Sequence, residues 1–327
     1  MELTVVIPCR DGGTRLEETL DALAAARPPA GGMEVVVSDD GSRPPLAPRP
    51  RPGLPIRVVR SETPRGRAAA CNRGLEAAAG RVVLVLDDDM TVSPETPAGH
   101  AGAHREELPP RAVVGRIDPD PRCFRGPFGR FLAEEERRRH DRLAARREDV
   151  AYTDCLTGHF SVLRRVLRDA GGYDEGFTGY GLEDIELAFR LRRAGVPIVY
   201  RPELAARHRS AHAGFREHCL RHLEVGAMAV RFARAHDDPG VRAFLRVDGM
   251  DPRAEPSRFR RAMARAHRLV RRSPAGLRPL LLLGGRAAAG VLGVTGPVKL
   301  RHAVYHMVRD MHFAAGVAGA LERGRST

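Results

Sequence analysis

Two groups of adjacent aspartates stand directly after apolar, strand-like runs in the first part of the chain. Asp39 and Asp40 follow one run, and residues 87–89, all aspartates, follow another. Neighbouring carboxylates repel one another and cost stability unless a cation neutralises them. Hard oxygen ligands of this kind suit Mg²⁺ or Mn²⁺, which would bridge a diphosphate. Taken alone, either group could equally be an exposed acidic turn or a helix cap.

A basic segment lies between the two acidic groups. Residues 64–74 open a helix that contains small side chains together with Arg65, Arg67 and Asn72. A helix N-terminus with arginines nearby is a favourable place for a phosphate group. The segment therefore predicts a phosphate contact, although an ordinary solvated helix start would have the same composition.

A third group of chemically capable residues follows a glycine-rich stretch. Residues 171–181 are rich in glycine, and Glu183 and Asp184 come next, in the first turn of an expected helix. Acidic residues in that position also stabilise a helix through its dipole. The functional interpretation is that Asp184 faces the site as a general base, while Leu187 and Leu191 anchor the buried side of the helix.

These residues need a sheet to bring them together. Apolar runs alternate with helical patterns, which predicts strands at 3–8, 33–37, 56–59, 81–86 and 112–117 and helices at 14–26, 67–79, 94–107 and 128–148. Nearly continuous apolar strands separated by helices are typical of a parallel sheet covered on both faces. Ligands of such sheets bind outside the carboxyl ends of the strands, where both aspartate groups are expected.

The second half of the chain has a different pattern of expected secondary structure. A mixed segment, 152–202, contains one further expected strand at 196–200. Beyond it the pattern is helical, with helices expected at 214–236, 256–271, 278–292 and 298–322. We therefore predict two domains, a catalytic α/β domain at 1–212 and a helical extension at 213–327.

The composition limits the class of protein. Hydrophobic residues make up 43% of the 327, enough for a sizeable core, and the net charge of +13 comes mostly from arginine. Such a charge could attract polyanions or be a solvated surface, and no nucleic-acid-binding motif accompanies it. The five cysteines form no CxxC pair, which favours reduced thiols in the cytoplasm. Neither a signal peptide nor a membrane-spanning run is expected.

Taken together, the motifs resemble the family 2 glycosyltransferases of the GT-A fold, of inverting type. The matching pieces are 5–11, 37–42, 67–74, 86–89 and 172–175, followed by Glu183 and Asp184. They occur in the order and with the separations typical of the family, and the resemblance covers about residues 1 to 210. It implies an α/β, Rossmann-like fold with a mostly parallel central sheet, here with a helical C-terminal extension.

The resemblance implies a donor site for a nucleotide-diphosphate sugar. The residues that it assigns to this site are Pro8, Arg10, Asp39, Asp40, Arg65, Arg67, Asn72, Asp87 and Asp88. Asp40, with Asp39, would contact the nucleotide base, and Pro8 and Arg10 would line the same pocket. One of the two arginines would approach the diphosphate or the base, and the first two aspartates of 87–89 would touch the ribose or the sugar.

The resemblance also implies a metal site with Mn²⁺ or Mg²⁺. Asp89 would be a ligand, as the last acid of a DxD motif. Enzymes of this kind often add a histidine downstream of the strand after the base helix, here the strand expected at 196–200. His208 is the first candidate for that ligand and His212 the second.

Catalysis and acceptor binding are assigned in the same way. Asp184 would be the catalytic base, and Glu183 would help to position the acceptor or the sugar. The residues assigned to the acceptor are Gly158, His159, Tyr180 and Gly181. An asparagine is more usual in the family where His159 stands.

The predicted reaction moves a sugar from a UDP-sugar to an acceptor hydroxyl on a saccharide, a lipid-linked molecule or a small molecule. UDP is chosen by analogy with the family alone. A retaining transferase acting on a small phosphorylated acceptor is one alternative. A sugar-1-phosphate nucleotidyltransferase, which would use the glycine-containing basic segment 9–15, is another, and a catalytically inactive binding module is the third. Nucleic acid is not expected as a partner.

The helical extension carries a basic stretch at 258–272 that is followed by apolar segments. This pairing suits a helix that lies on an anionic membrane surface, which would place the protein at the inner face of the membrane. It equally suits a helix packed on the catalytic domain with its arginines in solvent, and we favour packing. Acceptor recognition and dimerisation are further roles for the extension, and the oligomeric state is not predicted.

Overall fold

The computed structural model describes residues 1–209 and 214–324, and the side chains of all of these except 292–295. Contacts within the chain define two compact units. The first comprises Met1–Phe124, Leu132–Thr178 and Glu183–Ser210, and the second comprises Arg125–Phe131, Gly179–Leu182 and Ala211–Thr327.

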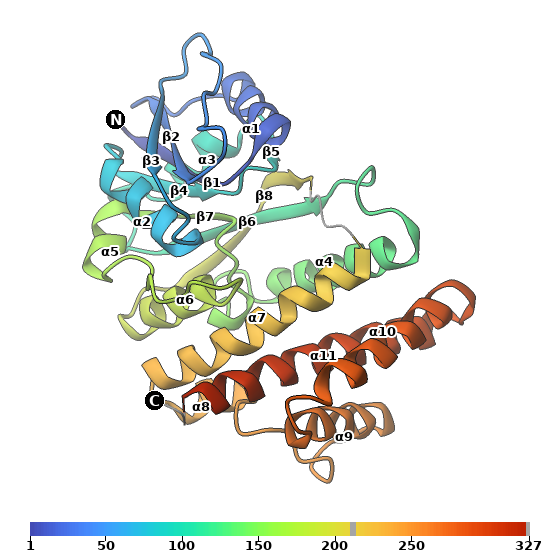
Figure 1. Ribbon diagram of the computed structural model, residues 1–327. Helices are drawn as coiled ribbons and strands as arrows, with labels where there is room; N and C mark the ends of the chain where they lie inside the picture. Colours follow the sequence, from blue (N-terminus) through green and yellow to red (C-terminus); the bar gives the residue numbers. More distant parts are fainter. Residues whose placement is uncertain (210–213, 325–327) are drawn as a thin grey trace. The chain divides into compact units, whose positions relative to one another are not determined.

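An eight-stranded sheet forms the centre of the first unit (Figure 1). Its strands are β1 (Leu3–Cys9), β2 (Met33–Asp40), β3 (Ile56–Ser61), β4 (Val82–Leu86), β5 (Met90–Val92), β6 (Ala112–Pro119), β7 (His159–Leu163) and β8 (Ile198–His208), in the order β3-β2-β1-β4-β7-β6-β8-β5. The strands β1 to β4 are mutually parallel, and β6 is parallel to β8. Every residue of β1 and β4 is buried, which explains why both read as continuous apolar runs.

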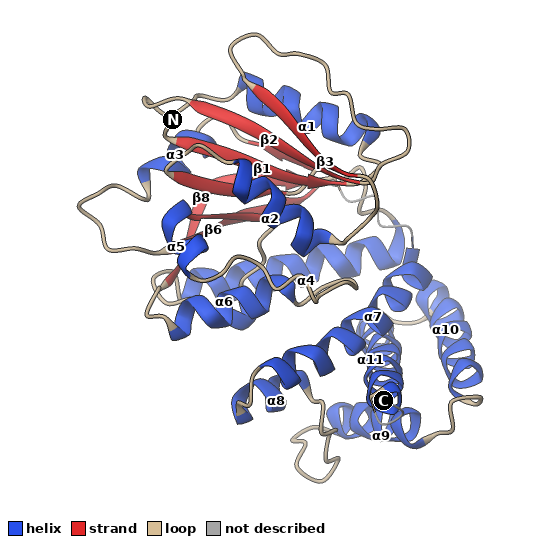
Figure 2. Ribbon diagram, turned by 60° about the vertical axis from the view of Figure 1, so that its left-hand side comes forward, coloured by secondary structure: helices blue, strands red, loops and turns tan. Residues whose placement is uncertain are grey.

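Helices cover both faces of this sheet. They are α1 (Gly13–Ala25), α2 (Arg67–Ala77), α3 (Thr96–Gly102), α5 (Arg164–Asp169) and α6 (Glu183–Arg193), with a 3₁₀ turn η1 (Tyr152–Asp154) and with α4 (Gly126–Ala145), whose first residues belong to the second unit. In Figure 2, α2 lies in front of the strands and α1 behind them. The small buried residues of α2, such as Ala68 and Cys71, let this helix pack closely on the sheet.

Two strands that the sequence did not predict make the sheet mixed. β7 pairs antiparallel with both of its neighbours, β4 and β6, and β5 pairs antiparallel with β8. β7 begins with His159, which the family resemblance assigned to the acceptor. This strand escaped prediction because it is short and contains two polar residues, His159 and Ser161, both fully buried.

The described part of the second unit is built from helices. They are α7 (Gly214–Ala235), α8 (Pro239–Leu245), α9 (Arg258–Arg272), α10 (Arg278–Thr295) and α11 (Val298–Arg323). Both α9 and α10 pack against α11, and Val270, Leu282 and Met311 form their shared core. The short helix α8, which begins with Asp238 as its N-cap, was not anticipated from the sequence.

The helices α7 and α11 cross at two glycines. A Cβ atom on Gly226 of α7 would collide with the backbone carbonyl of Phe313, and one on Gly316 of α11 would collide with the carbonyl of Leu223. The two backbones are therefore in direct contact at this crossing, which only residues without a side chain allow.

Candidate active site

The carboxyl ends of neighbouring strands bring the predicted donor residues to one edge of the sheet. Pro8 lies buried in β1 opposite Ser38 of β2, and Asp40 is the last residue of β2. Asp87 directly follows β4, which is parallel to β1. Arg10 lies just beyond β1 with most of its side chain exposed. The open-sheet rule that ligands bind at this edge therefore applies to these positions.

Asp39 and Asp40, predicted to contact the base, both bind protein groups. Asp39 accepts a hydrogen bond from the N–H of Ser42 (2.8 Å) and forms an ion pair with Arg60. Burial raises the pKa of Asp39, but its hydrogen bonds outweigh burial and leave the pKa below the ordinary value. Asp40 accepts hydrogen bonds from the backbone N–H groups of residues 65–66, at 2.9 and 2.8 Å. The two carboxylates thus shape the start of α2, and a base contact stays a prediction.

Arg67 joins the acidic end of β4 to the acidic start of α6. Its guanidinium lies 2.6 Å from the carboxylate of Asp87, 3.1 Å from Oγ1 of Thr157 and 3.7 Å from the carboxylate of Glu183. Gly158 allows this arrangement, because a Cβ atom there would collide with the Asp87 carboxylate. Two acidic positions that are remote in the sequence therefore share one cation.

Glu183 and Asp184 begin α6 next to this cation. The carboxylate of Asp184 accepts hydrogen bonds from the N–H of Ile185 (2.8 Å) and from that of Thr157 (3.4 Å). Burial raises the pKa of Glu183 to about 7, the charge of Asp184 adds to the rise, and Arg67 opposes it. Burial also raises the pKa of Asp184, again against the effect of Arg67. A carboxylate whose pKa is raised toward neutrality is suited to general base catalysis.

Asp89 and His208, the predicted metal ligands, lie side by side. The pairing of β5 with β8 puts Met90 opposite His208, and Nε2 of His208 is 3.2 Å from Oδ1 of Asp89. Burial lowers the pKa of His208, but the contact with Asp89 outweighs burial and raises it. The second histidine candidate, His212, lies outside the described residues.

One carboxylate and one imidazole fit a divalent ion that is shared with a ligand. Mg²⁺ and Mn²⁺ accept such donors and commonly take their remaining ligands from substrate phosphates and water. Within residues 1–209 and 214–324, no three His, Cys, Asp or Glu side chains come together as a complete metal site. Asp89 and His208 therefore fit an ion held jointly with a diphosphate better than a self-contained metal centre.

Asp88 has a different environment from its two neighbours. The thiol of Cys9 donates a hydrogen bond to Asp88 (3.0 Å), and Arg15 lies 3.9 Å away. Burial raises the pKa of Asp88 to about 6, and the charges of Asp89 and Asp87 add to the rise. No local pattern marked Cys9 and Arg15 for this role, although both belong to the glycine-containing basic segment 9–15.

Asn72 clamps the glycine-rich segment against α2. Its amide nitrogen donates to the carbonyl of Tyr173 (2.9 Å) and to Glu175 (3.1 Å), and its amide oxygen accepts from the N–H of Tyr173 (2.8 Å). Glu175 is also 2.9 Å from Arg65. Both ends of the amide are occupied by protein, so Asn72 has a structural role here, and its contact with a donor stays a prediction.

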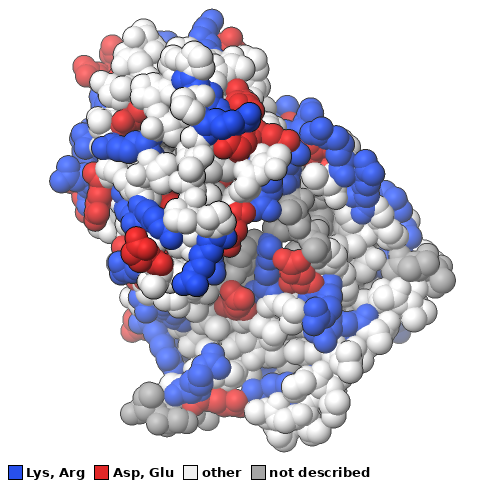
Figure 3. All heavy atoms as spheres, turned by 45° about the horizontal axis from the view of Figure 1, so that its top comes forward, with Lys and Arg blue, Asp and Glu red and all other residues white. Residues whose placement is uncertain are grey.

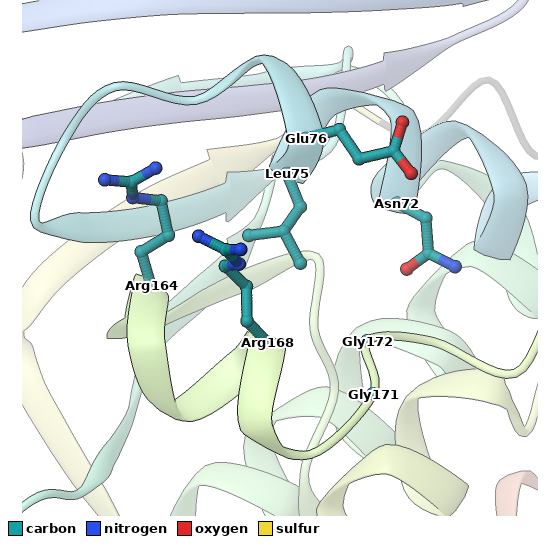
Figure 4. Close-up of a pocket in the computed structure, with 7 residues that line it drawn as sticks. All are labelled: Asn72, Leu75, Glu76, Arg164, Arg168, Gly171 and Gly172. Atoms are coloured by element: carbon teal, nitrogen blue, oxygen red, sulfur yellow. The ribbon is translucent and has the colours of Figure 1, made fainter.

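A cavity of about 410 Å³ opens beside Asn72, and Figure 4 shows it. Its lining consists of Asn72, Leu75, Glu76, Arg164, Arg168, Gly171 and Gly172. In Figure 4 the two arginines extend from α5 towards α2. The predicted catalytic and metal residues do not line this cavity.

His159, predicted to bind the acceptor, lies in the core. Its ring is fully buried, which lowers the pKa to about 4 and leaves it neutral. Nδ1 lies 3.3 Å from the carbonyl of Arg116 and therefore donates, so Nε2 accepts from Nε2 of His100 (3.0 Å). Ser161 continues this chain, at 2.7 Å from His100 and 2.8 Å from His104. The expected contact of the His159 side chain with an acceptor is not available in this structure.

Tyr180 and Gly181, also predicted to bind the acceptor, belong to the second unit. The N–H of Tyr180 donates to Glu224 (2.9 Å), and the guanidinium of Arg221 lies 5.0 Å from the centre of its ring. Gly181 has a φ of 85°, a conformation that favours glycine. The ring of Tyr180 is half exposed, and its contact with an acceptor stays a prediction.

Thr157 is a site residue to which the sequence analysis gave no role. Its hydroxyl accepts a hydrogen bond from Arg67, the partner of Asp87, and its N–H faces Asp184 at the start of α6. Thr157 therefore contacts residues at both acidic positions. The available signal was its place directly before Gly158, which the family resemblance assigned to the acceptor. Nothing in the local pattern indicated that the hydroxyl would meet an arginine from α2.

The positive charge of the chain does not form one continuous field on the face drawn in Figure 3. Lys and Arg side chains are interspersed there with Asp and Glu side chains. Many charges of the chain form ion pairs, such as those of Arg137 with Glu134 and Asp141 on α4. An interspersed surface of this kind is typical of ordinary solvated protein.

Comparison with known proteins bears on the family of the chain. Residues 4–171 match the family described as glycosyl transferase family 2, and residues 137–213 match the family described as the N-terminal domain of galactosyltransferase. The chain is 29% identical over 238 residues to the validoxylamine A glucosyltransferase of Streptomyces hygroscopicus, an alignment that covers 64% of this chain and 56% of that protein. It is 27% identical over 248 residues to the pre-mycofactocin glycosyltransferase of Mycobacterium tuberculosis, covering 72% and 48%.

The chain spans about half the length of the curated relatives that it matches. Among solved structures, a mannosyltransferase from Pyrobaculum calidifontis, in complex with GDP-Man and Mn²⁺, aligns with a TM-score of 0.60 at 17% identity, over 98% of this chain and 87% of that one. This likeness concerns the fold. It confirms the predicted α/β GT-A-like fold, with a mixed, mostly parallel sheet followed by C-terminal helices.

Proposed function

The chain belongs to glycosyl transferase family 2, and from this premise we propose that it transfers a sugar from a UDP-sugar to an acceptor hydroxyl with inversion. The observation that carries the proposal is the position of Arg67, which contacts both Asp87 and Glu183. The acids assigned to the donor and the acids assigned to catalysis therefore lie around one guanidinium. A cation at this point favours a ligand that carries a diphosphate.

The donor would be held at the carboxyl edge of the sheet together with Mn²⁺ or Mg²⁺. Asp89 and His208 are the residues that would hold the ion, since their donor atoms are 3.2 Å apart. When bound, the ion supplies positive charge against the leaving diphosphate. Arg67 and the N-terminal end of α2 add fixed positive charge from the protein itself.

Asp184 would accept the proton of the acceptor hydroxyl. As that oxygen forms its bond to the anomeric carbon, the bond from this carbon to the diphosphate oxygen breaks, and the configuration inverts. Glu183 is the less exposed of the two acids, and burial raises its pKa to about 7, so that a substantial share of it is protonated at neutral pH. The neighbouring Asp184 can then carry the negative charge that a base needs, because two adjacent carboxylates do not ionise together readily.

The donor can be identified before the acceptor is known. A thermal-shift panel of nucleotide sugars with Mn²⁺ should show one donor that raises the unfolding temperature clearly above the others, since a ligand stabilises the state that it binds. Transfer to saccharide, lipid-linked and small-molecule acceptors can then be followed as release of the nucleoside diphosphate. The anomeric configuration of the product, read by NMR, distinguishes inversion from retention.

The decisive variant is Asp184→Asn. It should lower transfer by roughly 100-fold or more, the usual range for loss of a general base, and leave the donor-induced thermal shift intact. Asp169→Asn is the matched control, because Asp169 is an exposed acid on α5, and it should change neither quantity. Transfer at the wild-type rate by Asp184→Asn would refute the assignment of the base.

A further inference from the structure

The turn between α9 and α10 in the second unit carries exposed leucines. Leu269 in α9, Leu277 in the connection, and Leu280 and Leu283 in α10 are 56, 52, 64 and 56% exposed. Single exposed leucines are common on proteins, but several in one short stretch mark an interaction site. The opposite side of α10 packs inside the second unit, because Leu282 is buried against α11.

The exposed face of α9 combines these leucines with arginines. Arg258, Arg265 and Arg272 follow one another at intervals of seven residues, which places them on the same face of the helix. All three are exposed, and none forms an ion pair in the described part of the chain. Leu269 lies on this face between the last two. The other face buries Ala264 and its neighbours against α11.

Residues 256–309 contain no Asp or Glu but twelve Lys and Arg. We call the seven exposed side chains described above the α9–α10 surface; they are Arg258, Arg265, Leu269, Arg272, Leu277, Leu280 and Leu283. Figure 1 shows the two helices that carry it, next to α11. A second copy of this chain is a poor occupant, because a symmetric contact would bring like charges together. Anionic lipid headgroups are complementary to it, and the leucines fit the apolar layer below the headgroups.

We propose that the α9–α10 surface docks on an anionic lipid bilayer, with its arginines against the phosphate groups and its leucines inserted beneath them. The contact is peripheral: the described helices include none with the length and apolar character needed to cross a bilayer. The proposal is independent of the proposed reaction, because all of its residues belong to the second unit. Sequence patterning favoured packing of the extension on the catalytic domain, whereas the exposed leucines favour a lipid surface.

The test is co-sedimentation of the full chain with vesicles. The wild-type protein should bind vesicles of phosphatidylglycerol and phosphatidylcholine, should not bind phosphatidylcholine alone, and should be released by salt. The triple variant Arg258→Gln, Arg265→Gln, Arg272→Gln should bind roughly 100-fold more weakly, since each basic residue near an anionic surface contributes roughly fivefold.

A second triple variant separates apolar insertion from charge. Leu277→Ser, Leu280→Ser, Leu283→Ser should lower binding to the anionic vesicles at least about tenfold, because inserted apolar area contributes to interfacial binding. Its far-UV circular dichroism and unfolding temperature should match those of the wild type, since the replaced side chains are exposed.

The matched control removes equal charge elsewhere. Arg105→Gln, Arg146→Gln, Arg165→Gln replaces three exposed arginines of the first unit and should bind like the wild type. Equal loss in this control, no binding by the wild type, or equal binding to neutral vesicles would overturn the proposal. So would a wild-type dimer in analytical ultracentrifugation that the leucine variant dissolves. The donor-induced thermal shift should persist in all three variants, because none of the replaced residues is assigned to the donor site. A failure of the membrane proposal can therefore be distinguished from a failure of the proposed reaction.

Discussion

Replacing Glu183 by Gln removes a charge that the folded protein holds at a cost. The side chain is 5% exposed, and one of its carboxylate oxygens, Oε2, is buried without a hydrogen-bond partner in the described structure. Burial raises the pKa from its ordinary value of 4.5 to about 7. That rise corresponds to about 3 kcal/mol that folding loses when the carboxylate is ionised. Gln has the same shape and no charge, so the substitution should raise the free energy of unfolding by about this amount.

The size of the effect depends on pH. The folded state binds the proton more tightly than the unfolded state, so the stability of the wild-type protein falls as the pH rises from the unfolded pKa through the folded one. At about pH 8 Glu183→Gln should therefore be more stable by about 3 kcal/mol, or roughly 6–12 °C in unfolding temperature. At about pH 5 the gain should fall below about 1 kcal/mol, because the folded wild-type carboxyl is already protonated.

The measurement is thermal and urea unfolding of both proteins at the two pH values. Glu107→Gln is the control, since Glu107 is exposed in the first unit, and it should change stability little at either pH. An unfolding temperature for Glu183→Gln at or below that of the wild type at about pH 8 would refute the reasoning. The same gain at both pH values would also refute it, because the effect would then have a cause other than the charge.

Two further predictions concern the metal ligands and the helix crossing. Asp89→Asn and His208→Gln should each abolish the part of the donor-induced thermal shift that requires Mn²⁺, as a chelator should in the wild type; an unchanged response to Mn²⁺ would remove the residue from the ligand set. Gly226→Ala should lower the free energy of unfolding by about 1–3 kcal/mol, since its Cβ would meet the Phe313 carbonyl. Gly290→Ala, where α10 leaves open space, should raise it by roughly 0.5–1 kcal/mol, and equal effects at the two glycines would contradict the close crossing.

Local patterns in the sequence were sufficient to predict most of the first unit. Apolar runs marked the strands at 3–8, 33–37, 56–59 and 81–86. The structure extends the first three by one to three residues and begins the fourth one residue later, at Val82. β5 and β7 could not be read in this way, because β5 has three residues and β7 contains buried polar side chains. The polarity of β7 is tolerated because His159 and Ser161 bind other buried groups, which only the fold supplies.

The sequence by itself determined which residues are able to do chemistry and at which strand and helix ends they stand. Residue type and short-range periodicity carry that information, and the family resemblance assigned a role to each residue. Only the tertiary structure decided the partners of two of the three aspartates, Arg67 for Asp87 and Cys9 for Asp88, and it supplied the direct contact of Asp89 with His208, which the family resemblance had named only as a second ligand of the same ion. These contacts join residues remote in the chain through the pairing of strands and the packing of helices. No local pattern encodes them, and that is why three identical neighbouring aspartates acquire three different environments.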